Sequence, residues 1–188
     1  MSKVVWKPGT MLSPVPPVLV TCGTMESPNI ITVAWTGIVC SRPAMTYISV
    51  RPTRYSHAII EKSGEFALNL TTPQLVHAAD FCGVTSGAKV DKFKEARLTP
   101  VAADKIAVPL IAESPLSLEC KVKEIFRLGS HDMFLAEIIA VDVEESCIDE
   151  AGKFSLKKCG LAAFSHGEYF ALGKRIGKFG YTVRKKKK

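Results

Sequence analysis

The feature that most constrains how this chain can fold is a long pair of predicted strands in its second half. Residues 116–123 alternate strictly between apolar and polar side chains, the pattern of a strand with one buried face and one wet face. Residues 129–132 supply a turn, and residues 133–143 have the composition of another long strand. Two such strands predict an antiparallel hairpin, so the domain is expected to be built around an antiparallel sheet.

Shorter predicted elements surround this hairpin. Apolar and β-branched runs predict strands at 17–22, 29–36, 44–50, 66–70 and 161–164. Helices are predicted over residues 53–62, 72–82 and 90–96. Thr53 is the expected N-cap of the first helix, and Gly64 its expected end. Because strands outnumber helices and do not alternate with them, the predicted fold class is mostly β, a closed or split β-barrel with a few helices around it.

Length and composition favour one globular domain. A chain of 188 residues with 47% hydrophobic and 23% charged residues can bury a sizeable core. Eight of its 25 Lys and Arg residues lie from Lys174 onward, which leaves 17 basic and 18 acidic residues in the rest. We expect a single domain over residues 1–182 and a solvated basic tail over 183–188. No apolar run has the length of a transmembrane helix and the first residues do not resemble a secretory signal, so a cytoplasmic protein is expected.

Missing motifs exclude several kinds of site. The sequence has no Gly-x-Gly-x-x-Gly dinucleotide fingerprint, no P-loop and no Gly-x-Ser-x-Gly nucleophile elbow. Its six cysteines include no Cys-x-x-Cys pair and no zinc-type spacing, so no metal site is predicted. Reduced thiols are the default, and a redox role for any of them stays open. No catalytic side chain is predicted either, so any activity would need an unfamiliar site or a borrowed cofactor.

The stretch 49–56 is the most informative candidate binding site. It runs from the end of a predicted strand into the first turn of a predicted helix, where free backbone N–H groups and a partial positive charge favour anions. Arg51 and Arg54 lie in this turn, and Thr53 and Ser56 add hydroxyls. These groups suit a phosphate. The alternative is a capped helix with exposed arginines, and the residues alone leave both interpretations open.

A second candidate is the strand that begins at Asn29. Asn29, Ile31, Val33 and Trp35 would share one face, and Thr32 and Ala34 the other. Buried polar groups need partners, which either a flat ligand with polar edges or cross-strand bonds would supply. Two further residues are ambiguous in the same way: by default His131 is a solvated loop histidine, and Lys92 a surface lysine paired with Asp91 or Glu95.

Short segments that together span about residues 10–182 occur in a characteristic order: Pro16-Pro-Val-Leu-Val-Thr21, Asn29-x-x-Thr-x-Ala-Trp35, Ser49-Val-Arg51 with Tyr55-Ser56, Gly64-Glu-Phe-x-Leu-Asn69, Val90-Asp-Lys-Phe93, Gly129-x-His131 and the segment around Tyr169. No single segment is specific, but the ordered set resembles the flavin reductase-like proteins of the FMN-binding split-barrel fold, and among them the flavoredoxin type. The resemblance implies a split barrel of Greek-key type, FMN as cofactor and a homodimer.

The resemblance also implies roles for the candidate residues. Ser49, Arg51 and Ser56 would hold the FMN phosphate, with Lys92 adding charge. Ser56 stands where many relatives have threonine, and the hydroxyl is kept. Around the isoalloxazine ring, His131 and Phe164 would approach from the hairpin and the last strand, within one chain or across a subunit boundary. The full set implied for the cofactor is Asn29, Thr32, Ala34, Trp35, Ser49, Val50, Arg51, Tyr55, Ser56, Lys92, His131 and Phe164.

Three functions are weighed on this basis. The leading one is a flavin-dependent oxidoreductase that keeps FMN bound and relays electrons, with a redox protein as a partner. The second is an NAD(P)H:flavin oxidoreductase that uses FMN as a substrate, in which nicotinamide stacks on the flavin. The third is a non-enzymatic ligand-binding barrel whose basic tail contacts single-stranded nucleic acid; the tail has few aromatic residues to stack on bases, so nucleic acid is disfavoured as a partner.

Overall fold

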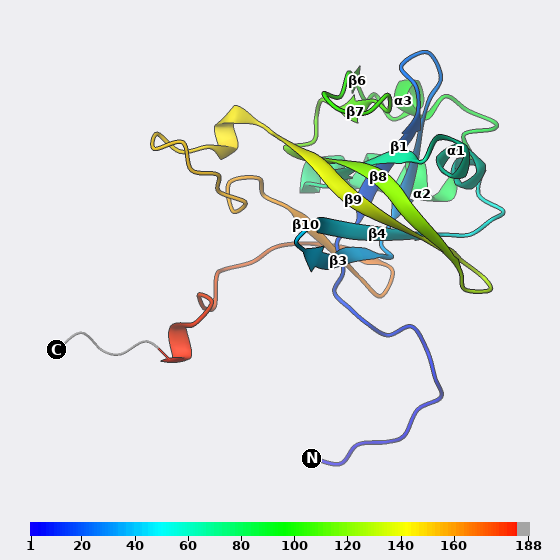
Figure 1. Cartoon of the computed structure of the whole chain (residues 1–188). Helices are drawn as coiled ribbons and strands as arrows, with labels where there is room; N and C mark the ends of the chain where they lie inside the picture. Colours follow the sequence, from blue (N-terminus) through cyan, green and yellow to red (C-terminus); the bar gives the residue numbers. More distant parts are fainter. Residues whose placement is uncertain (184–188) are drawn as a thin grey trace.

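The structure, a computed structural model, describes residues 1–183. Its centre is a seven-stranded antiparallel sheet in the order β2-β1-β5-β8-β9-β4-β3 (Figure 1). In chain order these strands are β1 (Val18–Gly23), β2 (Pro28–Val33), β3 (Thr36–Ser41), β4 (Ala44–Val50), β5 (Glu65–Leu70), β8 (Leu116–Arg127) and β9 (Asp132–Val143).

Smaller elements complete the described part of the chain. The short strands β6 (Pro100–Val101) and β7 (Leu110–Ile111) pair with each other, as do β10 (Ala162–Ser165) and β11 (Glu168–Ala171). The α-helices are α1 (Tyr55–Ser63), α2 (Val76–Val84) and α3 (Lys92–Glu95), and single 3-10 turns form η1 (Pro73–Leu75), η2 (Glu145–Cys147) and η3 (Tyr181–Val183).

The sheet is curled, because its two edge strands are consecutive in the chain. Only Ala34 and Trp35 separate β2 from β3, so the edges of the sheet have to approach each other at this link. The Trp35 carbonyl accepts a hydrogen bond from Ser49 N on β4 at 2.9 Å, while within residues 1–183 no ladder pairs β2 with β3. The sheet is therefore split rather than closed. The predicted mostly-β fold class with a split barrel is confirmed.

The long hairpin is confirmed, but one expectation about it is wrong. β8 and β9 pair from Leu116↔Val143 to Arg127↔Asp132. The predicted wet face of β8 is dry over its first half, where Ser117 and Glu119 are buried. Residues 103–111 cover this face through a small apolar cluster. The alternating pattern identified the strand, but it could not show that a distant loop folds over the polar face.

Apolar packing lies on both faces of the sheet. The larger cluster contains Val20, Ile31 and Phe66 and is covered by Ile60 of α1. Leu19 and Ile30, which point to the opposite face, pack against α2 and α3. The polar side chain of Asn69 is buried between strands and fully bonded, because its Nδ2 donates to Leu19 O at 2.9 Å and its Oδ1 accepts from Ile111 N at 3.0 Å.

Some boundaries differ from the sequence expectations. The strand expected over 29–36 ends at Val33, since the chain leaves β2 to cross to the other edge of the sheet. Strands β3 and β11 were missed: β3 is an edge strand whose apolar Ile38 and Val39 are exposed, and β11 has only four residues. Thr53 is not the N-cap of α1: Arg54 takes that place, with no side-chain cap, because the turn 51–54 precedes the helix. Gly64 ends α1 as expected, with φ 69°.

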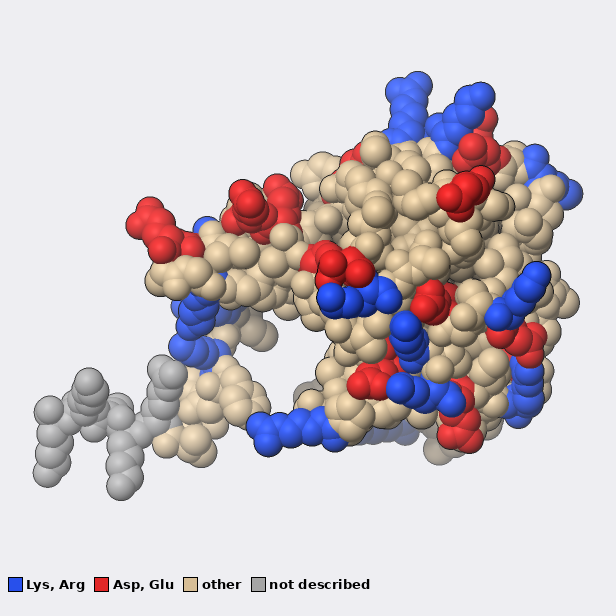
Figure 2. Space-filling view, turned by 45° about the horizontal axis from the view of Figure 1, so that its top comes forward, with Lys and Arg blue, Asp and Glu red and all other residues tan. Residues whose placement is uncertain are grey.

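The ends of the chain extend from the body. Residues 1–12 run away from the sheet as an exposed, irregular arm (Figure 1). The predicted tail, 183–188, lies outside the described residues except for Val183. On the face shown in Figure 2, basic and acidic side chains are interspersed. Among residues 1–183, no helix is both long enough and apolar enough to cross a membrane.

Candidate functional site

The first part of the candidate site is an anion pocket between the start of α1 and the segment that follows α2. Ser56, in the first turn of α1, is buried, and its Oγ accepts a hydrogen bond from Asn29 Nδ2 at 2.8 Å. Thr85, Ser86 and Gly87 face it from the end of α2. The pocket therefore combines hydroxyl groups with the N-terminus of a helix of nine residues. Its lining residues are Ile31, Thr53, Arg54, Tyr55, Ser56, Thr85, Ser86, Gly87 and Lys92.

Lys92 is the most unusual residue of the anion pocket. Only 4% of it is exposed, so it is not the surface lysine that the sequence suggested by default. Its Nζ donates to Ile30 O at 2.8 Å and to Cys82 O at 2.7 Å. A lysine ammonium carries three N–H groups, so one donor remains for a ligand. No carboxylate within residues 1–183 forms an ion pair with it.

The electrostatics of the anion pocket favour a negatively charged ligand. Burial lowers the pKa of Lys92, and the charge of Arg54 lowers it further, against the opposing effect of the nearby Cys82 and Cys22. Arg54 is held in place by a hydrogen bond from its guanidinium to Gly83 O at 2.8 Å. Two cations that disfavour each other, one of them buried without a counter-charge, would both be stabilised by a bound anion.

The second part is a cleft where β2 ends, called here the ring cleft. Trp35 and His131 form one wall, stacked with their ring centroids 4.3 Å apart and an interplanar angle of 21°. Trp35 remains 45% exposed, so this wall is open to a ligand. Burial and the charge of Arg51 lower the pKa of His131, which favours its neutral form. The ring cleft is lined by Ile31, Thr32, Val33, Ala34, Trp35, Ser49, Val50, Arg51, Arg54 and His131.

The two pockets adjoin each other, since Ile31 and Arg54 line both of them. Thr32 enters the ring cleft from β2, but its hydroxyl donates to Ala79 O on α2 at 2.5 Å. It can therefore act toward a ligand only as an acceptor. A cleft that combines an aromatic wall with fixed polar groups, beside a pocket that contains a buried lysine, suits a ligand with a flat ring at one end and an anion at the other.

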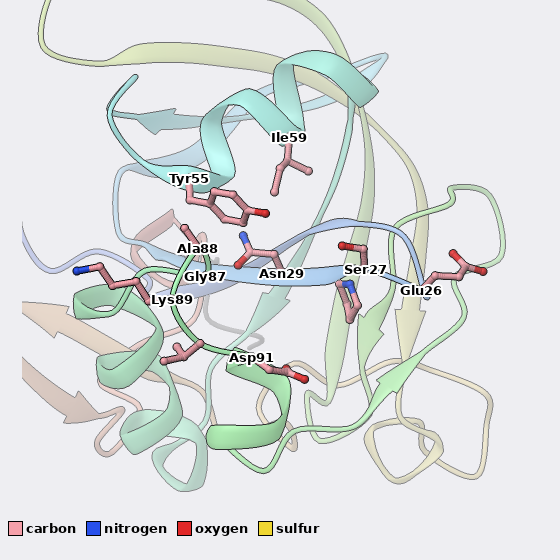
Figure 3. A pocket seen from close by; sticks show the side chains of 11 residues that line it. Glu26, Ser27, Asn29, Tyr55, Ile59, Gly87, Ala88, Lys89 and Asp91 are labelled. Atoms are coloured by element: carbon pink, nitrogen blue, oxygen red, sulfur yellow. The ribbon is translucent and has the colours of Figure 1, made fainter.

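A third pocket adjoins the anion pocket on the far side of Tyr55 and Gly87 (Figure 3). Figure 3 shows the side chain of Asn29 of β2 pointing toward the Gly87–Ala88 segment, with the ring of Tyr55 of α1 lying across the pocket above it. This approach is so close that a Cβ on Gly87 would lie 1.9 Å from Asn29 Oδ1. Glycine is thus the residue that lets the segment after α2 reach the strand.

The twelve residues predicted from the sequence fall into three groups. Tyr55, Ser56 and Lys92 line the anion pocket, while Asn29 lies beside it, bonded to Ser56. The remaining candidates from β2, the 49–51 stretch and the hairpin line the ring cleft; among them are Ser49 and Arg51, which were expected at the phosphate. Phe164 lies apart, in a pocket on the other side of Trp35 that also includes residues 10–13.

Sequence reasoning missed one wall of the anion pocket. Thr85, Ser86 and Gly87 belong to no predicted motif, although a Thr-Ser-Gly turn after a helix is a recognisable cluster of hydroxyl and backbone donors. Arg54 was expected in the anion turn but was not among the twelve residues predicted for the cofactor. These groups come together only because α2 packs across β2.

Comparisons with known proteins show the family to which the chain belongs. The family described as flavin reductase like domain matches residues 11–173, and the chain belongs to that family. The flavoredoxin of Desulfovibrio vulgaris (Miyazaki F) superposes with a TM-score of 0.89 at 31% identity, over 97% of this chain and 100% of that one.

Two sequence relatives show how far the similarity extends. An uncharacterized protein of Archaeoglobus fulgidus is 33% identical over 62% of this chain and 66% of its own length. The NADH-dependent FMN reductase of Streptomyces nodosus subsp. asukaensis is 30% identical over 68% of each chain. The resemblance to flavin reductase-like proteins, first drawn from the ordered segments, is confirmed.

Proposed function

We propose that the protein binds FMN across the anion pocket and the ring cleft and transfers electrons through it. The observation that carries this proposal is Lys92, a buried ammonium with one free donor and no carboxylate partner within residues 1–183. A phosphate monoester is the anion that such a pocket suits best, since charge-assisted hydrogen bonds to it are about twice as strong as neutral ones.

At the phosphate end, Lys92 and the N-terminus of α1 hold the anion. Ser56 and Ser86 add hydroxyls, and Arg54 sits at the junction of the two pockets. This assignment moves Ser49 and Arg51 away from the phosphate and toward the ribityl chain and the ring. The names of related proteins support FMN as the flavin, because one is a flavoredoxin and one an FMN reductase.

At the ring end, Trp35 and His131 form an aromatic wall beside the ring. Ala34 and Thr32 also line the ring cleft. Bound FMN supplies the redox chemistry, and the chain binds it, orients it and tunes it. The Arg51 guanidinium gives the ring cleft a fixed positive charge, which favours an anionic reduced ring.

Exchange of Lys92 for methionine tests the phosphate assignment. Lys92→Met removes the buried charge and should weaken FMN binding about 10- to 100-fold, the range expected for a charged hydrogen bond. The measurement is a fluorescence titration of the apoprotein with FMN. Lys94→Met is the matched control, because Lys94 lies on the same short helix and is exposed. Equal FMN affinities of the two variants would contradict the assignment.

A second candidate activity is NAD(P)H-dependent reduction of flavin. It is favoured by the name of the Streptomyces relative and by the exposed Trp35 wall, which leaves one side of the ring cleft open to a nicotinamide. The alternative is a relay that receives electrons from a redox protein. Anaerobic mixing with NADH or NADPH separates them: bleaching of bound FMN within seconds supports the reductase, and stable flavin absorbance supports the relay.

We also infer a homodimer. The N-terminal arm exposes Val4, Val5, Trp6 and Leu12, and its end at Thr10 and Leu12 flanks Trp35. Such apolar side chains are expected to be covered by a second copy rather than by water. Light scattering after size exclusion should therefore give a molar mass twice that of one chain. Deletion of residues 1–9 should lower the measured mass toward that of a single chain. A monomeric full chain would overturn the inference.

A further inference from the structure

Two buried cysteines, Cys147 and Cys159, lie in contact outside the pockets described above. Their Sγ atoms are 3.0 Å apart, and the residues are only 1% and 5% exposed. Within residues 1–183 no other cysteine has a second sulfur as a hydrogen-bond partner. A disulfide brings the two sulfurs to about 2.0 Å, so a shift of about 1 Å joins this pair.

The pair sits in the 144–161 segment, the connection between β9 and β10. This segment projects away from the sheet (Figure 1, yellow to orange). Its internal contacts are mainly turn-type hydrogen bonds, together with the isolated bridge Ile148↔Phe154 and a hydrogen bond from Ser155 N to Cys147 O at 2.8 Å. The two sulfurs lie buried in the interior of this segment.

The 144–161 segment contributes no side chain, neither cysteine included, to the apolar core clusters of the described chain. Two of its larger apolar side chains, Phe154 and Leu156, are exposed. Small units that cannot bury an adequate core are commonly held by covalent cross-links. A bond between residues 147 and 159 would close the loop at its base.

We propose that Cys147 and Cys159 form a reversible disulfide on contact with a small-molecule disulfide, and that this bond fastens the 144–161 segment. Two thiols lose two protons and two electrons as the S–S bond forms. The oxidant takes up both electrons and both protons, and is released as two thiols. This proposal is independent of flavin binding.

The surroundings of Cys159 set the speed of the reaction. Burial raises the pKa of the Cys159 thiol to about 12, and the neighbouring Cys147 thiol adds to the shift. Because the thiolate is the attacking species, the bond should form slowly at neutral pH and faster as the pH rises.

The test counts free thiols in the full chain. Cys40→Ser is the starting protein, because the partly exposed Cys40 would otherwise take up a mixed disulfide. After treatment with oxidised glutathione, alkylation under denaturing conditions should label three thiols instead of five, and a reductant should restore five. Peptide mapping should find residues 147 and 159 linked. The matched control, Cys40→Ser with Cys159→Ser, should keep all four of its thiols.

A second readout tests the fastening of the segment. Trypsin cleavage at Lys153, Lys157 or Lys158, followed on reducing gels, should slow about tenfold or more in the oxidised protein, since loop closure suppresses local opening. Five labelled thiols after oxidation, or a cross-link at any other pair, would overturn the proposed disulfide. Unchanged proteolysis with the bond formed would overturn its fastening role.

Discussion

At the scale of single residues, binding and stability place opposite demands on Lys92. Its pKa is lowered by burial, so the folded apoprotein releases this proton more readily than the unfolded chain, whose lysines titrate near 10.4. Lys92 therefore lowers the free energy of unfolding of the apoprotein at every pH at which it is charged. This loss of stability decreases as the pH rises toward about 10.4. A bound phosphate would remove the penalty by supplying the missing counter-charge.

The pH dependence of unfolding tests this cost. We expect the free energy of unfolding of apo Lys92→Met to exceed that of the wild type by most at pH 7. This difference should shrink between pH 7 and about 10, because in that range Lys92 of the wild type loses its proton more easily in the folded than in the unfolded chain. Urea unfolding of both proteins at several pH values measures the difference, in which shared titrations cancel. A gain that grows with pH would contradict the argument.

Gly87 gives a second test at this scale. Gly87→Ala would put a Cβ 1.9 Å from Asn29 Oδ1, so the segment after α2 must move away from β2. We expect a loss of stability of about 1–3 kcal/mol, typical of overpacking, together with weaker FMN binding. Gly173→Ala is the control, since its added Cβ meets nothing within 4 Å. Chemical denaturation and FMN titration of both variants are the measurements.

At the scale of elements, buried polar side chains connect loops to strands. Glu119 of β8 is fully buried, and its carboxylate accepts hydrogen bonds from Asp104 N at 2.8 Å and Lys105 N at 2.7 Å. Asp132, at the start of β9, bonds His57 Nε2 of α1 at 2.8 Å and also pairs with Arg127. The first set holds a loop on the outer face of the sheet, and the second ties α1 to the hairpin that carries His131.

Glu119→Gln should therefore loosen the loop on β8. An amide can accept only one of the two backbone hydrogen bonds, and its NH₂ group would face the other N–H. We expect a loss of about 1–3 kcal/mol in unfolding free energy. Glu124→Gln, at an exposed position on the same strand, should change it by less than about 0.5 kcal/mol. Thermal and urea denaturation compare the two, and similar losses would sink the explanation.

At the scale of the whole molecule, the buried thiols set an alkaline limit on stability. Burial raises the pKa of Cys22 and Cys82 to about 11, and of Cys120 to about 12. Unfolded thiols ionise near pH 8.5, so above that pH the unfolded chain releases protons that the folded chain retains. The contribution of these thiols to the free energy of unfolding is fully present below about pH 8.5 and is lost as the pH rises toward 11.

We accordingly expect the midpoint of thermal unfolding, measured in reductant, to fall steadily from about pH 8.5 upward. Cys120→Ala should reduce this slope, because it removes the thiol whose pKa is raised to about 12. Exchange of the partly exposed Cys40 for alanine should leave the slope unchanged. A flat profile between pH 8.5 and 10.5 would contradict the assignment.

Much of the architecture was readable from local sequence. β4 was predicted with its observed bounds, and β1, β5 and β9 to within one residue, because alternating or continuous apolar runs report the burial of each strand directly. The ordered segments also identified the family, which the family match confirms. The end of β2 and the start of β3 carry no such signal, because they are set by where the chain crosses from one edge of the sheet to the other.

The site was only half readable. Residue types on β2 and in the 49–56 stretch indicated candidates for a ring and an anion, which stay predictions, since strand alternation and helix starts are local properties. The burial of Lys92 could not be predicted in this way, because a lysine among the charged residues of a short predicted helix, 90–96, is by default a surface residue paired with Asp91 or Glu95. Only the packing of α3 against β2 and α2 puts its ammonium on the carbonyls of Ile30 and Cys82. Burial is set by what covers a residue, and here the cover comes from segments distant in sequence.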